Sequence, residues 1–178
     1  MTNFVYVATS LDGFIATSDG GLDWLNEIPN PEKSDFGYAK FMSSIDAIVM
    51  GRHTFEKVLT FDYWPYDKPV YVLTKSKVDV PKKLEDKAKT ISSNLEELVD
   101  QLKKLGYQNL YIDGGITIQG FLEADLIDEM IITRVPVLLG NGIPLFGPLT
   151  RRLYFKHLGT EVLNETLTKS HYIRVRDF

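Results

Sequence analysis

The chain has 178 residues, with 20 lysines and arginines against 24 aspartates and glutamates, which gives a formal net charge of −4. A hydrophobic content of 44% is enough to build a full core, so the composition excludes intrinsic disorder and low-complexity scaffolds. No apolar run reaches the roughly 18 residues of a membrane span, and the first residues lack the basic-then-apolar order of an export signal. We therefore expect one domain over residues 1–178, in the cytoplasm, with no membrane partner.

The cysteine and histidine content narrows the chemistry further. There is no cysteine, which removes disulfides, thiolate nucleophiles, iron–sulfur ligation and cysteine-based zinc sites. The only histidines are His53, His157 and His171, and their spacing does not place two ligands on one metal. The mildly acidic balance also lacks the cationic excess of a nucleic-acid-binding surface. We expect no bound metal and no nucleic-acid partner.

The first part of the chain predicts a strand, a long loop and a helix. Residues 4–8 are β-branched and aromatic, which is typical of a buried strand. Glycines and prolines punctuate residues 10–33, and a loop of that length is usually functional or mobile. A helix then follows, capped at Ser34 or Asp35 and running to about residue 43.

The middle of the chain repeats the order strand, turn and helix. Leucines at helical spacing between a cap at Ser93–Asn94 and Gly106 give the clearest helix. The predicted strands cover residues 46–50, 69–74 and 110–112, and the predicted helices cover residues 52–58, 95–105 and 117–124. Strands that alternate with helices indicate a mostly parallel sheet that is covered on both faces.

The last third of the chain changes character. Residues 129–138 predict one extended strand, and residues 153–163 and 165–175 are extended with no helix between them. Such strands are typical of antiparallel additions to a sheet edge. The predicted fold class is therefore α/β, with three layers, a mostly parallel central sheet, helices on both faces and antiparallel C-terminal strands.

Three of the predicted strands end in residues suited to an anion. Gly51–Thr54 follows one strand with a glycine, two side chains that can carry a positive charge, and a hydroxyl, and Thr74–Lys77 follows another with hydroxyls and lysines. Asp113–Gly115 follows a third, where two glycines let backbone N–H groups surround an anion. Ligands of open α/β sheets bind at the carboxyl ends of the strands. Each stretch alone is more often a plain turn, but together they predict a diphosphate site with a further phosphate near Arg52 and Lys75, as in NADPH.

Several stretches resemble a known superfamily. Residues 49–56 (Val-Met-Gly-Arg-His-Thr-Phe-Glu) are similar to the cofactor stretch of dihydrofolate reductases, and Asp113–Gly115 resembles their double-glycine turn. Residues 10–16, 21–24 and 137–146 are more similar to the reductase domain of the riboflavin-pathway deaminase-reductases, a branch of that superfamily.

The resemblance implies a dihydrofolate-reductase-like fold, NADPH as hydride donor, and a pyrimidine or pteridine substrate. It also implies a set of cofactor contacts, with every residue read at its position in this chain. These residues are Ala8, Ile15, Gly51, Arg52, His53, Thr54, Leu73, Thr74, Lys75, Ser76, Asp113, Gly114, Gly115, Ile116, Thr117 and Ile118.

Two acids are candidates for the catalytic position. Asp35 lies fifteen residues before Met50, as does the first-helix acid of dihydrofolate reductases, and it could bind the ring and relay a proton. Asp35 could equally be a plain helix cap. Asp12, in a turn that faces the nicotinamide in the riboflavin-type branch, is the second candidate, although Asp-Gly is also a common turn dipeptide.

Two departures from the resemblance bear on the function. The arginine that clamps folate in dihydrofolate reductases has at best Lys68 in its place, so folate is in doubt as the substrate. A chain without cysteine cannot supply the deaminase zinc site, which predicts a stand-alone reductase. We expect 5-amino-6-(5-phosphoribosylamino)uracil reductase-like activity; the alternatives are dihydrofolate reductase proper or a catalytically silent nucleotide-binding protein. The superfamily and the apolar run Val135–Leu139 also suggest a homodimer.

Overall fold

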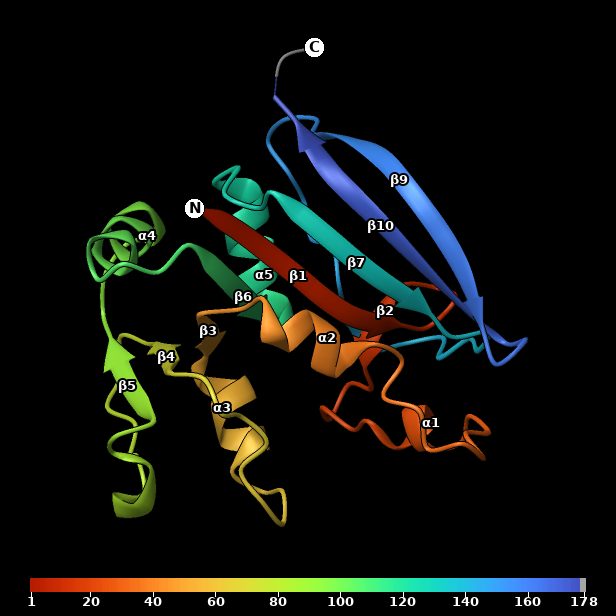
Figure 1. The fold of residues 1–178 in the computed structure, drawn as a ribbon, viewed down its shortest axis with the longest axis horizontal. Coiled ribbons are helices and arrows are strands. Elements are labelled where there is room, and N and C mark those ends of the chain that lie inside the picture. Colours follow the sequence, from red (N-terminus) through yellow and green to blue (C-terminus); the bar gives the residue numbers. More distant parts are fainter. Residues whose placement is uncertain (177–178) are drawn as a thin grey trace.

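An eight-stranded sheet takes its strands from nearly the whole chain (Figure 1). The structure is a computed structural model and describes residues 1–176. The strand order is β5-β4-β3-β6-β1-β7-β10-β9; all neighbours from β5 to β7 are parallel, and β10 is antiparallel to both β7 and β9. The strands of this sheet are β1 (Thr2–Thr9), β3 (Ala47–Gly51), β4 (Val70–Leu73), β5 (Ala88–Ile91), β6 (Asn109–Asp113), β7 (Glu129–Arg134), β9 (Tyr154–Leu163) and β10 (Leu167–Val175).

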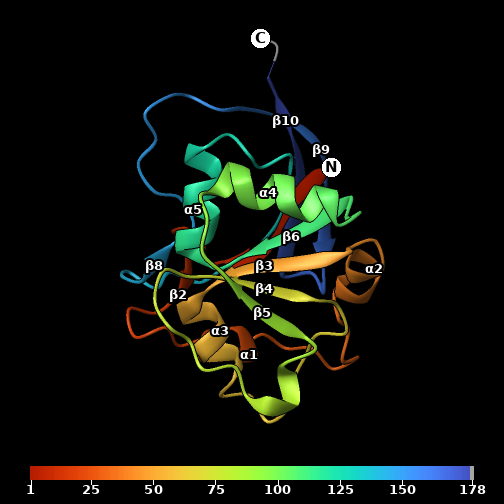
Figure 2. The same ribbon diagram turned by 90° about the vertical axis from the view of Figure 1, so that its left-hand side faces the viewer.

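Helices cover both faces of the sheet, which confirms the predicted fold class (Figure 2). The helices are α1 (Asp23–Asn26), α2 (Tyr38–Ser43), α3 (Arg52–Val58), α4 (Leu95–Lys104) and α5 (Gly115–Glu123), with a 3₁₀ turn over Lys82–Leu84. Side chains alternate between the faces of a strand. In β3, Val49 packs with residues of α4 and α5, whereas Ile48 and Met50 pack with residues of α2 and α3.

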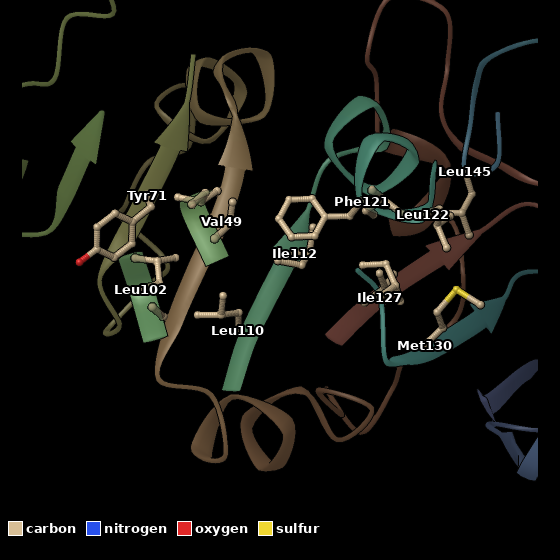
Figure 3. Close-up of a cluster of buried hydrophobic side chains, with 14 residues drawn as sticks. Val49, Tyr71, Leu102, Leu110, Ile112, Phe121, Leu122, Ile127, Met130 and Leu145 are labelled. Atoms are coloured by element: carbon tan, nitrogen blue, oxygen red, sulfur yellow. The ribbon is translucent and has the colours of Figure 1, made fainter. Parts of the chain in front are cut away.

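The larger core cluster lies between the sheet and helices α4 and α5 (Figure 3). Leu110 and Ile112 of β6 are fully buried there, as are Leu102 of α4 and Phe121 of α5. Because apolar side chains cover most of both faces, the polar residues of the strands collect at their ends. The functional groups are therefore found at the edge where the parallel strands end, called here the carboxyl edge.

The predicted helix over residues 35–43 begins later than expected. It starts at Tyr38, because Phe36 and Gly37 have φ values of +52° and +88°, which are left-handed and incompatible with a helix. Asp35 nevertheless supplies a cap, since its carboxylate accepts the backbone N–H groups of Gly37 and Ala39.

The strand predicted over residues 129–138 is too long. Observed β7 ends at Arg134, and Pro136, which has no N–H to donate to a ladder, follows two residues later. The predicted loop over residues 10–33 contains α1 and strand β2 (Phe14–Ala16), which pairs with β8 (Ile143–Pro144) in a separate two-stranded sheet. The sequence also gave no sign of β5, where only Ala88 is buried.

Candidate active site

The three turns marked for anion binding lie side by side at the carboxyl edge. Strand β3 lies between β4 and β6, and the register pairs Gly51 with Leu73 and Met50 with Asp113. The stretches that follow these strands therefore start at the same edge of the sheet. The structure thus brings together residues that are far apart in the sequence, as a diphosphate site requires.

Two glycines at this edge are packed so closely that a side chain has no room. Gly114 has φ +88°, and a Cβ built on it would overlap the Thr54 hydroxyl. At Gly51, a Cβ would lie 2.8 Å from Thr117 Oγ1. Backbone and threonine hydroxyls therefore meet directly at the start of α5, where N–H groups and the helix dipole favour an anion. This arrangement fits the diphosphate of a dinucleotide.

A cavity of about 420 Å³ adjoins the end of β4. Thr74 Oγ1 both accepts the Ser76 N–H and donates to the Ser76 carbonyl, which fixes the turn beside it. On the opposite wall, Asn94 caps α4 by accepting the Glu97 N–H at 2.8 Å. The lining residues are Leu73, Thr74, Lys75, Ser92, Ser93, Asn94, Leu95 and Glu96. Hydroxyls, an amide and a lysine suit the sugar and phosphate groups of a nucleotide.

Arg52 and His53 lie on the surface at the start of α3. Arg52 Nε is 3.6 Å from Glu56 Oε1, and His53 Nδ1 is 3.7 Å from Glu56 Oε2. Their side chains are 38% and 74% exposed, so this one carboxylate leaves both of them accessible. Both side chains are therefore accessible to a phosphate beside the Gly51 turn.

The remaining predicted cofactor residues fall into different environments. Ile15 of β2 packs on the double-glycine turn, because its Cδ1 would lie 2.9 Å from a Cβ on Gly115. Ile116 is 73% exposed, whereas Ile118 is fully buried and its N–H donates to the Gly114 carbonyl. Ile118 thus supports the turn from the core side.

Asp113, at the end of β6, is held by its neighbours. Its carboxylate accepts the Gly114 N–H at 2.8 Å and lies 3.5 Å from the Tyr66 hydroxyl. Burial raises the pKa of Asp113, and these hydrogen bonds oppose that rise. Asp113 therefore shapes the double-glycine turn.

A second cavity, of about 350 Å³, lies over the ends of β1 and β7. Because β1 lies beside β6 in the sheet, this cavity and the double-glycine turn belong to neighbouring strands. Its wall is mainly apolar, with a few polar groups and one carboxylate, as is typical of small-molecule sites. The lining residues are Tyr6, Ala8, Leu25, Asn26, Ile28, Asn30, Asp35, Phe36, Thr133, Val135 and Leu167. Ala8, predicted to contact the cofactor, lies here.

Asp35 is both a helix cap and part of the wall of the second cavity. Its Oδ1 accepts the Gly37 N–H at 2.9 Å and its Oδ2 accepts the Ala39 N–H at 2.8 Å. The Ala39 and Gly37 bonds, with a smaller contribution from Lys169, lower the pKa of Asp35. A carboxylate oxygen has more than one acceptor site, so these bonds leave Asp35 able to accept from a ligand as well.

Asp12 connects two loops. Its carboxylate accepts the Ser10 hydroxyl at 2.6 Å, the Leu139 N–H at 3.2 Å and the Gly140 N–H at 2.8 Å. These bonds, with the Ser10 bond the strongest, lower the pKa of Asp12. Asp12 lines neither cavity. Its visible contribution is to hold residues 139–140 against the first turn.

Several polar residues in or beside the second cavity were not expected from the sequence, among them Asn26 and Asn30 of its lining. Thr133 lies in its wall, and the Tyr6 hydroxyl and the Lys169 ammonium both donate to the Phe36 carbonyl, at 3.0 and 2.8 Å. An alternating strand pattern around Tyr6 and Thr133 could have marked them as neighbours on adjacent strands. Nothing local marks Lys169, because its partner lies 133 residues away in the chain.

Two kinds of feature are absent from residues 1–176. Within this range, no helix is long and apolar enough to cross a bilayer. The same residues contain no cluster of three or more histidine, aspartate or glutamate side chains that could hold a metal ion.

Comparison with known proteins places the chain in a family. Residues 3–169 match the family described as the RibD C-terminal domain. The protein YwjB of Bacillus subtilis (strain 168) is 39% identical over 175 residues, which covers 96% of each chain. A proposed riboflavin biosynthesis protein from Shewanella sp. PV-4 has a crystal structure with a TM-score of 0.95, 49% identity, and coverage of 99% of this chain and 100% of that one.

More distant structures share the fold. The deaminase and 5-amino-6-(5-phosphoribosylamino)uracil reductase of Thermotoga maritima has a TM-score of 0.75 at 17% identity, and the match covers 98% of this chain and 56% of that one. Dihydrofolate reductase from Enterococcus faecalis, in complex with NADP(H), has a TM-score of 0.67 at 19% identity over 99% of this chain and 97% of that one. The chain is therefore a member of the RibD C-terminal domain family with a dihydrofolate-reductase-like fold.

Proposed function

We propose that this protein is an NADPH-dependent reductase that acts on a C=N or carbonyl-type bond of a pyrimidine or pteridine substrate, similar to the 5-amino-6-(5-phosphoribosylamino)uracil reductases. Family membership supports the reaction class, and the two cavities support a division of labour between cofactor and substrate. The observation that carries the proposal is their placement. The turns after β3, β4 and β6, the first cavity beside the β4 turn, and an apolar second cavity containing a carboxylate all lie at the carboxyl edge of one sheet.

The cofactor half of the proposal assigns the diphosphate to the turns after β3 and β6. Gly51, Gly114 and Gly115 let these turns pack closely against neighbouring side chains, which holds the turns in place, and the N-terminus of α5 supplies N–H donors. Arg52 and Lys75 are the cations for a 2′-phosphate. When bound, NADPH supplies a hydride, and the protein supplies position and electrostatics.

The substrate half assigns the ring to the cavity of about 350 Å³. There Asp35 accepts hydrogen bonds from the amino or imino edge of the ring, and Thr133 adds a hydroxyl at the same wall. Reduction of a C=N bond adds a hydride to carbon and a proton to nitrogen. Because its pKa is lowered, Asp35 is ionised near neutral pH; it therefore favours the protonated ring and passes the proton from solvent.

The test is a turnover assay with purified protein. NADPH oxidation is followed at 340 nm against a panel of pterins, dihydrofolate and aminouracils with and without a ribosyl phosphate. We expect oxidation that depends on one ring class. NADPH binding without oxidation across the panel would support the alternative of a silent nucleotide-binding protein, and a strong preference for dihydrofolate would support dihydrofolate reductase proper.

A homodimer is a separate proposal. The apolar run that suggested it is largely covered within the chain, since Val135 is buried in a cluster with Trp24, Val137 and Leu139, while Leu138 is 68% exposed. The superfamily resemblance is therefore stronger support for a dimer than the apolar run Val135–Leu139. Light scattering should give twice the chain mass of 20.3 kDa; the mass of one chain would reject the dimer.

A further inference from the structure

The backbone carbonyl of Phe36 is anchored from two directions. The Tyr6 hydroxyl of β1 donates to it at 3.0 Å, and the Lys169 ammonium of β10 donates to it at 2.8 Å. Phe36 needs such support, because its φ of +52° is a conformation that a bulky side chain rarely adopts. Burial, followed by the nearby charges of Asp35 and Glu161, raises the pKa of Tyr6 to about 12, so its hydroxyl stays protonated and donates.

Lys169 is a nearly buried cation whose direction is fixed. Its side chain is 14% exposed, and its Nζ lies 2.7 Å from Glu161 Oε1 on the neighbouring strand β9. In the register of β10 and β7, Lys169 pairs with Thr133, a residue of the second cavity. A Cβ on Gly37 would lie 3.2 Å from the ammonium. The glycine next to Phe36 therefore lets the cation approach.

The segment that Lys169 anchors carries Asp35. Asn30, Asp35 and Phe36 of this segment line the second cavity, and the Asn30 amide bonds to the backbone of Ser34 between them. Gly37 and Ala39, whose N–H groups bind the Asp35 carboxylate, follow directly after the anchored carbonyl. A shift of that carbonyl would therefore move both donors away from Asp35.

We infer that Lys169 is a positioning residue: directed by Glu161, it holds the Phe36 carbonyl and so fixes the wall that presents Asp35 to the ring. The role given to Asp35 rests on the proposed function, whereas the anchoring of the Phe36 carbonyl by Lys169 does not. The charged and titratable groups that face Lys169 are Glu161 from β9, Asp35 from the wall segment and Tyr6 from β1. With these partners present, its cation is held in a single direction.

The main test is Lys169→Met in the full chain, without cofactor or substrate. The Gly37 and Ala39 amides should exchange with solvent at least about tenfold faster, as expected when a charge-assisted hydrogen bond is lost. A carboxyl NMR titration should show a higher pKa for Asp35, because a positive charge is gone and its two N–H donors are looser. Lys156→Met, which removes an exposed lysine from β9, is the matched control and should change neither measurement.

Two further variants separate anchoring from general damage. Lys169→Arg keeps the charge and should keep the low pKa of Asp35, and Glu161→Gln should speed exchange at Gly37 and Ala39 less than Lys169→Met does. In the active enzyme, Lys169→Met should shift the acid limb of the kcat/KM profile to higher pH and leave NADPH affinity within about twofold.

Unchanged amide exchange or an unchanged Asp35 pKa in folded Lys169→Met would overturn the inference. If that variant does not fold, unchanged exchange in Glu161→Gln overturns it instead. Failure of the wild-type protein to reduce any ring compound would overturn the proposed function, while the exchange and titration results would still decide the anchoring.

Discussion

Arginines and aspartates lie at both ends of the parallel strands, but they are tightly paired at one end and loosely paired at the other. At the end where the strands begin, Asp125 binds Arg174 through both carboxylate oxygens, at 2.6 and 3.0 Å, and also pairs with Arg151 and Arg176. There Asp128 accepts the Asn3 N–H and pairs with Arg176. At the carboxyl edge, Arg52 has one loosely placed carboxylate partner.

This difference separates stability from function. Charges at the first end are matched by several partners within the chain, and Arg174, at their centre, is 6% exposed. At the carboxyl edge, Lys75 lines the first cavity and Asp35 lines the second, and both side chains can still form hydrogen bonds to a ligand. Substitutions at the first end should therefore change folding with little effect on binding, and substitutions at the carboxyl edge should do the reverse.

Gly115→Val should have the largest effect on binding. The new side chain would collide with Ile15 and Ile143, which lie 2.9 and 3.2 Å from the Cβ position, and would displace the turn from the cofactor. NADPH binding in a fluorescence titration should drop below detection while the chain stays folded. Gly159→Val is the control, because nothing lies within 4 Å of its Cβ position. If folded Gly115→Val binds NADPH with unchanged affinity, the turn has only a structural role and does not contact the cofactor.

Asp35→Asn should lower kcat by about 10²–10⁴, the usual contribution of a positioned acid or base, with NADPH affinity nearly unchanged. The matched control is Asp19→Asn, because Asp19 is also an exposed carboxylate that accepts a local backbone N–H, from Gly21, but lies outside both cavities. If turnover survives Asp35→Asn and collapses in Asp12→Asn, the acid role belongs to Asp12.

Asp125→Asn should destabilise the fold by about 3 kcal/mol and leave NADPH binding unchanged, because it leaves a buried guanidinium without its countercharge. Burial alone would raise the pKa of Asp125, but the Arg174 bonds and the charges of Arg174, Arg176 and Arg151 lower it overall. A lowered folded-state pKa means that this stabilisation is present above the ordinary carboxyl range and is lost as the pH falls through the folded value.

Urea unfolding between neutral and acid pH measures this effect. The wild type should lose stability on acidification more steeply than Asp125→Asn. The control is Asp79→Asn, whose exposed partner Lys77 is 3.9 Å away and should contribute less than about 1 kcal/mol. Equal stabilities for Asp125→Asn and the wild type at neutral pH would contradict the assignment of this cluster to folding.

Arg52→Ala should have the smallest effect, and a selective one. Loss of one charge-assisted bond to a 2′-phosphate weakens NADPH by about 10- to 150-fold and leaves NADH nearly unchanged. Arg152→Ala, at an exposed arginine of the loop before β9, should change neither affinity. If Arg52→Ala lowers the affinities for NADPH and NADH equally, Arg52 does not bind the 2′-phosphate.

Local patterns in the sequence predicted the layers and most elements of the fold. Apolar periodicity and caps such as Asn94 act within a few residues, which is why α4 and the strand-end turns were foreseeable. Strand β5 was missed because it is an exposed edge strand with little apolar pattern. The strand over residues 129–134 was overextended because the apolar run continues past Pro136.

Of the candidate site, the strand-end turns were predictable from local patterns, and Asp35 and Ala8 of the second cavity only through the family resemblance. The glycines and polar residues of these turns follow strands directly, so the three turns could be recognised together, although each alone is more often a plain turn. The wall of the second cavity depends on contacts between distant segments: Tyr6 and Lys169 converge on Phe36 from strands at opposite ends of the chain. No local pattern encodes that convergence. Asp35 both caps a helix and lines a cavity. From the sequence, these two roles could be given only as alternatives.

Hydride transfer between the two halves of the carboxyl edge can be measured directly with NADPH deuterated at the transferred C4 position. The protein is incubated with this cofactor and the ring compound that it turns over fastest, and the product is analysed by mass spectrometry. We predict one deuterium in the product, on the carbon of the reduced C=N or C=O bond, and a matching loss of product in Asp35→Asn. Oxidised cofactor with no deuterium in any ring product would contradict the account.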